Sequence, residues 1–197
     1  PALAQLGDLA ASNPEFVKAF RAKWGLDLPL WQRYLIFLQG LVHGDFGISI
    51  ASQRPVLDDI RDFAPATIEL ATVAFLLSIF VGVPLGMIAA VKRDTWIDHI
   101  ARFVSLIGVS APTFWLAFIM LALFYGMLEI APGPGRLDPI AFAPDRVTGL
   151  LLIDCVLARD WETLRDALAH LALPAIVLAA ATLGLITRTT RAAMLES

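Results

Sequence analysis

Charge is scarce in this sequence of 197 residues, and cysteine occurs once. Charged residues make up 17% of the chain and the formal net charge is −3, whereas about 25% of the residues in soluble domains are charged. Without clustered Lys and Arg the chain is not a nucleic-acid-binding protein, because phosphate contacts need them. The single Cys155 excludes an internal disulfide and a thiolate zinc cluster.

Signatures of catalysis are also missing. The chain has no His-Glu-x-x-His, no Gly-x-Ser-x-Gly elbow and no Gly-x-x-x-x-Gly-Lys-Ser/Thr phosphate loop. His43, His99 and His170 are far apart in the sequence, so we predict no metal site. We therefore expect no enzyme activity from this chain alone.

Apolar residues are what the sequence has in excess. They make up 58% of the chain, and mean hydropathy is +0.72. Three stretches, about 67–91, 101–130 and 168–188, are long enough for helices that cross the roughly 30 Å hydrocarbon core of a bilayer. The sequence predicts an all-α integral membrane protein, with residues 66–197 as its membrane domain.

Residues 1–65 contain no spanning stretch, and they predict an extracytoplasmic segment with short amphipathic helices. Ser12-Asn13-Pro14-Glu15 is a capping box that begins one helix. A second helix begins after Asp27-Leu28-Pro29, and its aromatic-rich face over residues 30–41 suits either the lipid headgroup layer or packing against protein. Gly44-Asp45-Phe46-Gly47 predicts a turn.

The orientation of the spans follows from the positions of Lys and Arg, because short segments next to a span that are rich in these residues favour the cytoplasmic side. They concentrate in the link 92–102 and just after the third span, at Arg188 and Arg191. We predict that the link and the C-terminus are cytoplasmic, and that residues 1–65 and the outer loop 131–167 are extracytoplasmic. Because nothing upstream could carry residues 1–65 across the membrane, we expect a fragment that lacks one preceding span.

Small residues recur every four positions on the first span. Ala74, Ser78, Gly82 and Gly86 form this ridge, where another helix can approach closely. Since small residues are common in membrane helices, a chance repeat is the alternative. We predict helix packing at these four residues.

Prolines interrupt two of the spans. Pro84 and Pro112 each remove a helical hydrogen bond, so both spans should bend or break there. Beside Pro112, the hydroxyls of Ser110 and Thr113 could satisfy freed backbone groups. Interrupted helices line pathways in transporters, which makes Ser110, Pro112 and Thr113 the candidate translocation residues; ordinary tolerance of proline in membrane helices is the alternative. Pro174 is expected to mark only the start of the third span.

Two acidic residues, Glu69 and Glu129, lie in apolar stretches within about one turn of an outer end. Their side chains can reach interfacial water, so we predict interfacial positions rather than a proton relay. Cys155 is expected to be a buried small side chain rather than a reactive thiol.

Several motifs, in this order and spacing, resemble the permease subunits of bacterial dipeptide- and oligopeptide-type ABC importers. They are Gly44-Asp45-Phe46-Gly47-Ile48-Ser49, Pro65-Ala66-Thr67-Ile68-Glu69-Leu70, Gly82-Val83-Pro84-Leu85-Gly86, Gly108-Val109-Ser110-Ala111-Pro112-Thr113-Phe114-Trp115, Pro132-Gly133-Pro134-Gly135-Arg136, Leu173-Pro174-Ala175 and Arg188-Thr189-Thr190-Arg191-Ala192-Ala193-Met194-Leu195-Glu196. The resemblance implies a type I importer transmembrane domain of six spans in the bacterial inner membrane. This chain would lack the first span and everything from the cytoplasmic coupling helix onward.

The same resemblance implies partners and a function. Half of a translocation path would come from this subunit and half from a second homologous permease. Two ATP-binding cassette subunits would hold ATP and Mg, so no cofactor is expected in this chain, and an extracytoplasmic substrate-binding protein would deliver the substrate. The resemblance leaves the substrate open among dipeptides, oligopeptides, nickel complexes and glutathione. The alternative function is a membrane scaffold or sensor subunit with an extracytoplasmic ligand-binding region.

Overall fold

The computed structural model describes residues 15, 18 and 27–196 of the chain. The chain forms two compact units, Pro1–Arg61 and Asp62–Ser197. In the described part, the regular elements are helices, and a single antiparallel bridge joins Ile48 and Pro55. This agrees with the predicted all-α fold.

The first unit contains α4 (Leu30–Val42), which begins after Pro29 as predicted. The fixed φ of a proline suits this position, and its carbonyl accepts the first helical bonds from Gln32 and Arg33 at 3.0 and 3.1 Å. None of the residues of α4 is buried among the described part of the unit. The helix predicted after Ser12 falls largely outside the described residues.

The predicted turn after α4 is present. Gly44 and Gly47 have φ values of +80° and +76°, which favour glycine because it has no Cβ. The Asp45 carboxylate accepts the Gly47 N–H at 2.9 Å, as in turns that begin with Asp.

The second unit contains two long apolar helices, the first of which begins six residues before the unit does. α5 (Val56–Val91) and α9 (Trp161–Glu196) have 36 residues each, and each is long and apolar enough to cross a membrane. At 1.5 Å per residue each helix is about 54 Å long, well above the roughly 30 Å hydrocarbon core. Both helices therefore extend beyond the lipid. The predicted stretches 67–91 and 168–188 lie within them.

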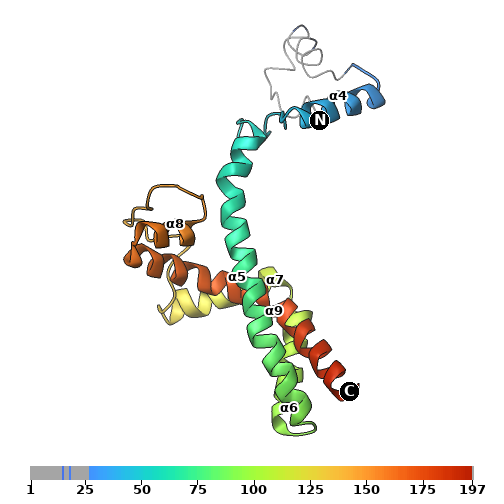
Figure 1. Cartoon of the computed structure of the whole chain (residues 1–197), viewed down its shortest axis with the longest axis vertical. Coiled ribbons are helices and arrows are strands. Elements are labelled where there is room, and N and C mark those ends of the chain that lie inside the picture. Colours follow the sequence, from blue (N-terminus) through green and yellow to red (C-terminus); the bar gives the residue numbers. More distant parts are fainter. Residues whose placement is uncertain (1–14, 16–17, 19–26, 197) are drawn as a thin grey trace. The chain divides into compact units, whose positions relative to one another are not determined.

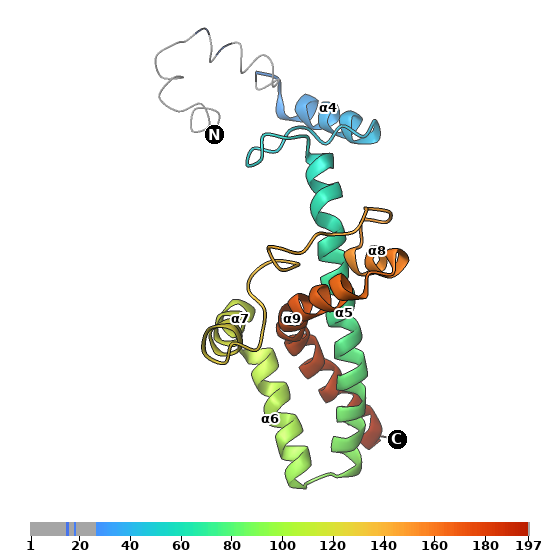
Figure 2. The ribbon, with the colours of Figure 1, turned by 90° about the vertical axis from the view of Figure 1, so that its left-hand side faces the viewer.

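A third candidate span is bent sharply. α6 (Trp96–Ser110) is followed by α7 (Thr113–Met120) and the π-helix η1 (Leu121–Met127). The two halves qualify as a span only together, and they meet at an angle of 110°. Figure 2 shows α6 and α7 running in different directions. The predicted stretch 101–130 is thus not one straight helix.

Three prolines lie in the predicted spans, and they differ in their effect on the helices. At the break, Ala111 is extended at φ −78° and ψ 130°, and α7 begins after Pro112, because proline disfavours a helical residue before it. α5 is not broken at Pro84, since it continues to Val91, and of the predicted bend or break only a bend stays a prediction there. The prediction that Pro174 starts a helix was wrong: α9 begins at Trp161, well before it.

α5, α6 and the C-terminal half of α9 lie side by side in the second unit (Figures 1 and 2). Residues that face inward between them are mostly small, such as Ala74, Ala89, Ala101 and Ala179. Small side chains let the backbones approach closely, which is how membrane helices pack without a hydrophobic driving force.

The loop between η1 and α9 contains α8 (Leu151–Ala158) and is fastened by Asp154. The buried Asp154 carboxylate accepts the Thr148 N–H and hydroxyl, both at 2.7 Å, and the Gly149 N–H at 3.0 Å. Burial raises the pKa of this carboxyl, but the hydrogen bonds from Thr148 and Gly149 outweigh burial and hold the pKa below its usual 3.8. The loop is therefore closed by an ionised carboxylate.

Cys155 lies beside Asp154 in α8 and is completely buried. Burial raises the pKa of its thiol, which disfavours the reactive thiolate. The prediction of a buried small side chain is confirmed.

Candidate functional site

The predicted packing ridge of α5 faces α9. Ala74, Ser78, Gly82 and Gly86 are all buried. The Ser78 hydroxyl donates to the Ala179 carbonyl of α9 at 3.2 Å, in addition to Ala74 in its own helix at 2.8 Å. In the other direction, the Thr187 hydroxyl of α9 donates to the Gly82 carbonyl at 3.2 Å. Along the ridge, α5 and α9 are therefore joined by hydrogen bonds as well as by close packing.

The two glycines of the ridge lie in close contact with α9, and Gly86 leaves no room for a side chain. A Cβ on Gly86 would lie 2.7 Å from both the Thr187 carbonyl oxygen and the Thr190 Cβ. A Cβ on Gly82 would lie 3.0 Å from Ile186 Cγ2. These contacts lie on either side of Pro84, and they hold α5 against α9 where the proline alone would weaken the helix.

A second close contact joins α6 to α9, and the sequence analysis missed it. A Cβ on Gly108 would lie 2.4 Å from the Ala180 carbonyl oxygen, and one on Gly184 would lie 2.6 Å from the Ser105 carbonyl oxygen. The signal was present in the sequence, since Ala101, Ser105 and Gly108 are small residues three or four apart on one helix face.

The candidate translocation residues Ser110, Pro112 and Thr113 lie together at the break between α6 and α7, and all three are exposed. The expected role of the two hydroxyls stays a prediction. No side-chain hydrogen bond caps α7, and the groups at the break bond through the backbone: Ala111 N–H to Ile107 at 2.9 Å and Leu116 N–H to Pro112 at 3.1 Å.

Thr113 also lines a cavity of about 390 Å³. The cavity is bounded by Leu70 of α5, the loop 132–135 and the α9 residues His170 and Pro174. Its walls are mainly apolar, and the His170 ring nitrogen Nδ1 lies 3.1 Å from the Asp166 carboxylate. The break thus lies beside a concave surface built from α5, α7, η1, α9 and the loop 132–135.

The two acidic residues differ in their surroundings. Glu129 is exposed, two residues after the end of η1, with φ +52°. Glu69 is only 9% exposed and does not reach toward water as expected. Its carboxylate forms an ion pair with Arg136 and accepts the Leu152 N–H in the first turn of α8 at 2.7 Å. Glu69 thus fastens the loop and α8 to α5.

At the opposite end of the bundle, Asp98 forms a buried ion pair that sequence reasoning missed. Its side chain is fully buried, and it accepts Arg191 Nε at 2.7 Å and Arg191 Nη2 at 2.9 Å. Arg102 Nη2 and the Asp94 N–H bond to the same carboxylate at 2.8 and 3.1 Å. Asp98 joins the start of α6 to the end of α9.

Comparison with known proteins identifies the architecture. Residues 82–197 match the family described as the binding-protein-dependent transport system inner membrane component. The chain belongs to this family. The predicted resemblance to dipeptide-type ABC permeases and the predicted all-α membrane fold are confirmed, and the protein is an inner membrane protein.

Curated relatives cover the whole chain. It is 45% identical over 196 residues to the probable D,D-dipeptide transport system permease protein of Escherichia coli (strain K12), and 38% identical over 198 residues to the dipeptide transport system permease protein of the same organism. The putrescine export system permease protein of that strain is 38% identical over 157 residues, 77% of this chain. The chain spans 57%, 58% and 48% of the lengths of these three relatives. Family membership indicates a non-catalytic subunit.

Proposed function

We propose that this chain is part of the transmembrane permease subunit of an ATP-driven importer, and that it lines one half of a translocation path for dipeptides. The observation that carries the proposal is the 110° break at Pro112, which leaves the hydroxyls of Ser110 and Thr113 exposed beside a cavity of about 390 Å³. In lipid, irregular backbone is tolerated only where it is buried in protein or lines a water-filled path.

Dipeptides are favoured over oligopeptides, nickel complexes and glutathione by the names of two relatives that match this chain over its whole length. A relative named for putrescine export shows that substrate differs among similar permeases.

The proposed assembly contains a second homologous permease, two ATP-binding cassette subunits and an extracytoplasmic substrate-binding protein. The family description, which names transport dependent on a binding protein, supports the last of these. ATP and Mg would bind to the cassette subunits, so this chain would need no cofactor of its own.

The proposed topology has the link 92–102 and the C-terminus in the cytoplasm, and residues 1–65 and 131–167 outside. It is supported by the ion pair between Asp98 and Arg191, because this contact brings the two flanks rich in Lys and Arg to one end of the bundle. At the other end, Glu69 contacts Arg136 and Leu152 of the outer loop. Cysteine labelling at positions 96 and 145 with an impermeant reagent tests this arrangement, and labelling of only position 96 in intact cells would reverse it.

Transport is tested with the full-length permease, its partner permease, both cassette subunits and the binding protein reconstituted in vesicles. We expect ATP-dependent uptake of a labelled dipeptide that unlabelled dipeptide abolishes and putrescine does not. Dipeptides of D- and L-residues are compared as separate competitors. If no dipeptide is taken up and the external segments signal when a ligand binds, the alternative of a membrane sensor or scaffold would be favoured.

A further inference from the structure

We propose that His170 contacts the substrate in the cavity beside the break, and that its ring nitrogen Nε2 accepts a hydrogen bond from the N-terminal ammonium group of the transported peptide. This proposal rests on the proposed transport function and adds a specificity-determining residue to it. His170 lies in α9 and lines the cavity of about 390 Å³ together with Thr113. A volume of about 300–1,000 Å³ is usual for small-molecule sites.

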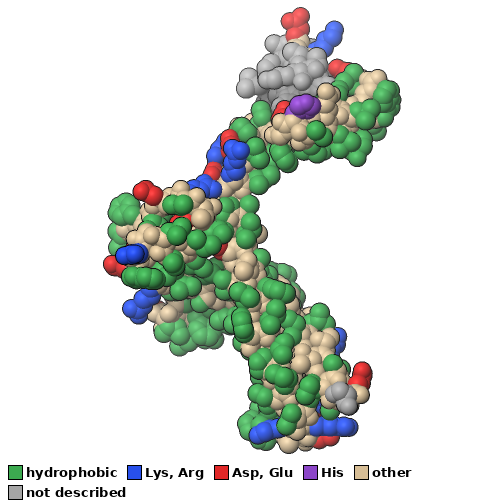
Figure 3. Space-filling model, in the orientation of Figure 1, with side chains coloured by type: hydrophobic (Ala, Val, Ile, Leu, Met, Phe, Trp, Pro, Cys, Tyr) green, Lys and Arg blue, Asp and Glu red, His purple; other side chains and the backbone are tan. Residues whose placement is uncertain are grey.

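The imidazole ring of His170 is a polar group in apolar surroundings. In Figure 3, hydrophobic side chains cover most of the visible helices of the second unit, and charged side chains lie toward its ends. The cavity walls are also mainly apolar and include Leu70, Ala117 and Val177. The His170 side chain is only 4% exposed, and buried polar atoms normally have a hydrogen-bond partner.

One of the two ring nitrogens already has partners. Nδ1 lies 3.0 Å from the Asp166 carbonyl oxygen and 3.1 Å from the Asp166 carboxylate. Both groups accept hydrogen bonds and do not donate them, so Nδ1 carries the hydrogen. In the neutral ring Nε2 is then an acceptor, and it forms no hydrogen bond to any residue that the structure describes.

The charges around the ring favour a cation as the ligand. A second cavity, of about 160 Å³, is lined by His170, Glu69 and Arg136. Glu69 and Arg136 pair with each other, which leaves the Asp166 carboxylate as the unbalanced charge beside the ring. This charge disfavours an anionic group at Nε2 and favours an ammonium group. Every unmodified dipeptide carries one, and hydrogen bonds with a charged partner are the stronger ones.

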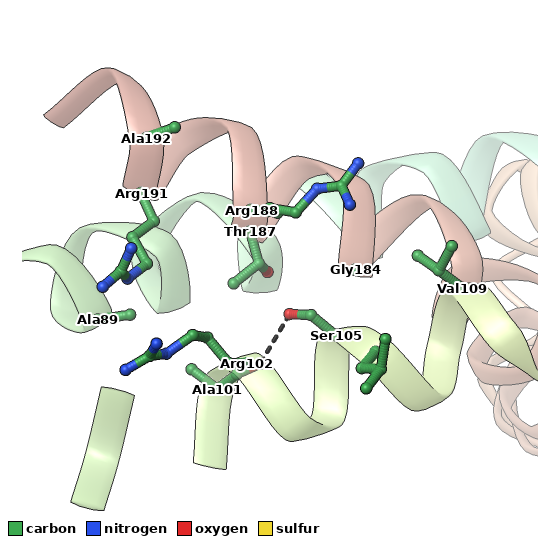
Figure 4. Close-up of a pocket in the computed structure, with 11 residues that line it drawn as sticks. Ala89, Ala101, Arg102, Ser105, Val109, Gly184, Thr187, Arg188, Arg191 and Ala192 are labelled. Carbon is green, nitrogen blue, oxygen red and sulfur yellow. Dashed lines mark hydrogen bonds between the residues drawn. The ribbon is translucent and has the colours of Figure 1, made fainter. Parts of the chain in front are cut away.

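The groove of about 440 Å³ between α6 and α9 offers no comparable site. Figure 4 shows Arg102 and Arg191 on facing helices, and both donate to the Asp98 carboxylate. The Arg188 side chain is directed away from them. The polar groups of that groove do not converge on one point, whereas the imidazole of α9 places a buried acceptor on a cavity wall.

The contact is tested with bromoacetyl-alanine, which is glycyl-alanine with bromine in place of the N-terminal ammonium group. A neutral Nε2 at this position attacks the CH₂ carbon, forms an N–C bond and releases bromide. In the assembled complex with the full-length permease, we expect mass spectrometry to find alkylated His170. Alkylation should be about tenfold slower with glycyl-alanine at about ten times its dissociation constant. His43 and His99 are internal controls, because both are exposed and the dipeptide should not protect them.

Two substitutions separate substrate contact from the contact with Asp166. The shorter amide of His170→Asn reaches the position of Nδ1 and can keep the Asp166 contact, whereas the amide of His170→Gln reaches the position of Nε2 and supplies an acceptor there. His170→Asn is expected to lower dipeptide uptake about tenfold, because a hydrogen bond to a charged group is lost. His170→Gln should restore part of the uptake.

The contact is refuted if His170 is not alkylated, if glycyl-alanine does not slow its alkylation, or if His170→Asn transports normally. None of these results affects dipeptide uptake by the wild-type complex, so the proposed transport function would stand. Absence of uptake by the wild-type complex is the separate result that refutes the transport function.

Discussion

Arg191, near the end of α9, donates two parallel hydrogen bonds of 2.7 and 2.9 Å to the buried carboxylate of Asp98. The two residues are 93 positions apart in the sequence. This bidentate geometry is the strongest form of an arginine–carboxylate pair. The ion pair therefore links the turn between α5 and α6 to the end of α9.

Removing one partner of this pair should destabilise the bundle. Asp98→Asn is expected to lower the free energy of unfolding by about 3 kcal/mol, because Arg191 would be left without its counter-charge. The thermal unfolding of the purified complex measures this. Arg93→Gln is the control, since the Arg93–Asp94 pair is 65% and 71% exposed and should contribute less than about 1 kcal/mol. Equal shifts in the two variants would contradict a special role for Asp98.

Close helix contacts should make particular glycines irreplaceable. Gly108→Ala and Gly82→Leu are expected to cost about 1–3 kcal/mol or to impair assembly, because the new side chain would overlap α9. Gly126→Ala should be tolerated, since nothing lies within 4 Å of a Cβ there. The yield of assembled complex after size-exclusion chromatography is the readout. A normal yield for Gly108→Ala would rule out the tight approach of α6 to α9.

Glu69→Gln should loosen the outer loop. The substitution removes the charge that pairs with Arg136, and a hydrogen bond to a charged group contributes about 1.5–3 kcal/mol. Hydrogen exchange at the Leu152 amide should become faster, because this amide bonds to the Glu69 carboxylate. Glu129→Gln, at an exposed position, serves as the control. Unchanged exchange at Leu152 in the Glu69 variant would refute the proposed fastening.

The loop before α8 should open at acidic pH. Hydrogen bonds from Thr148 and Gly149 lower the pKa of Asp154 in the folded protein. A lowered pKa stabilises the fold above the unfolded value, and that stabilisation is lost as pH falls through the folded value. Exchange of the Thr148 and Gly149 amides should therefore rise below roughly pH 4 relative to its intrinsic rate. Asp154→Asn should remove most of this pH dependence, and a variant with the same profile as the wild type would disprove the assignment.

Transport should depend on the break between α6 and α7. Pro112→Ala allows the helix to continue past Ser110 and should change both dipeptide uptake and ATP hydrolysis stimulated by the binding protein. Pro84→Ala is a matched control, because α5 is already continuous through Pro84. If Pro112→Ala leaves both rates unchanged, the break is a tolerated irregularity and no part of the pathway.

Local chemistry was enough to predict several features of this protein. The apolar stretches predicted the long helices, since a single helical segment satisfies its own backbone groups inside lipid. Pro112 predicted the break, because the clash of a proline with the residue before it is local. The four-residue spacing of Ala74, Ser78, Gly82 and Gly86 predicted one buried face.

The tertiary structure determined which charged residues form ion pairs and which proline interrupts its helix. Asp98 pairs with Arg191, 93 residues away, and Glu69 pairs with Arg136, 67 residues away. No local sequence pattern predicts these ion pairs, because they depend on which helix ends come together. Pro84 and Pro112 have the same local chemistry, yet only Pro112 breaks its helix. The difference is packing: Gly82 and Gly86 lie against α9 on both sides of Pro84, whereas near Pro112 only Gly108, before the break, lies against α9, and residues 112–115 are exposed.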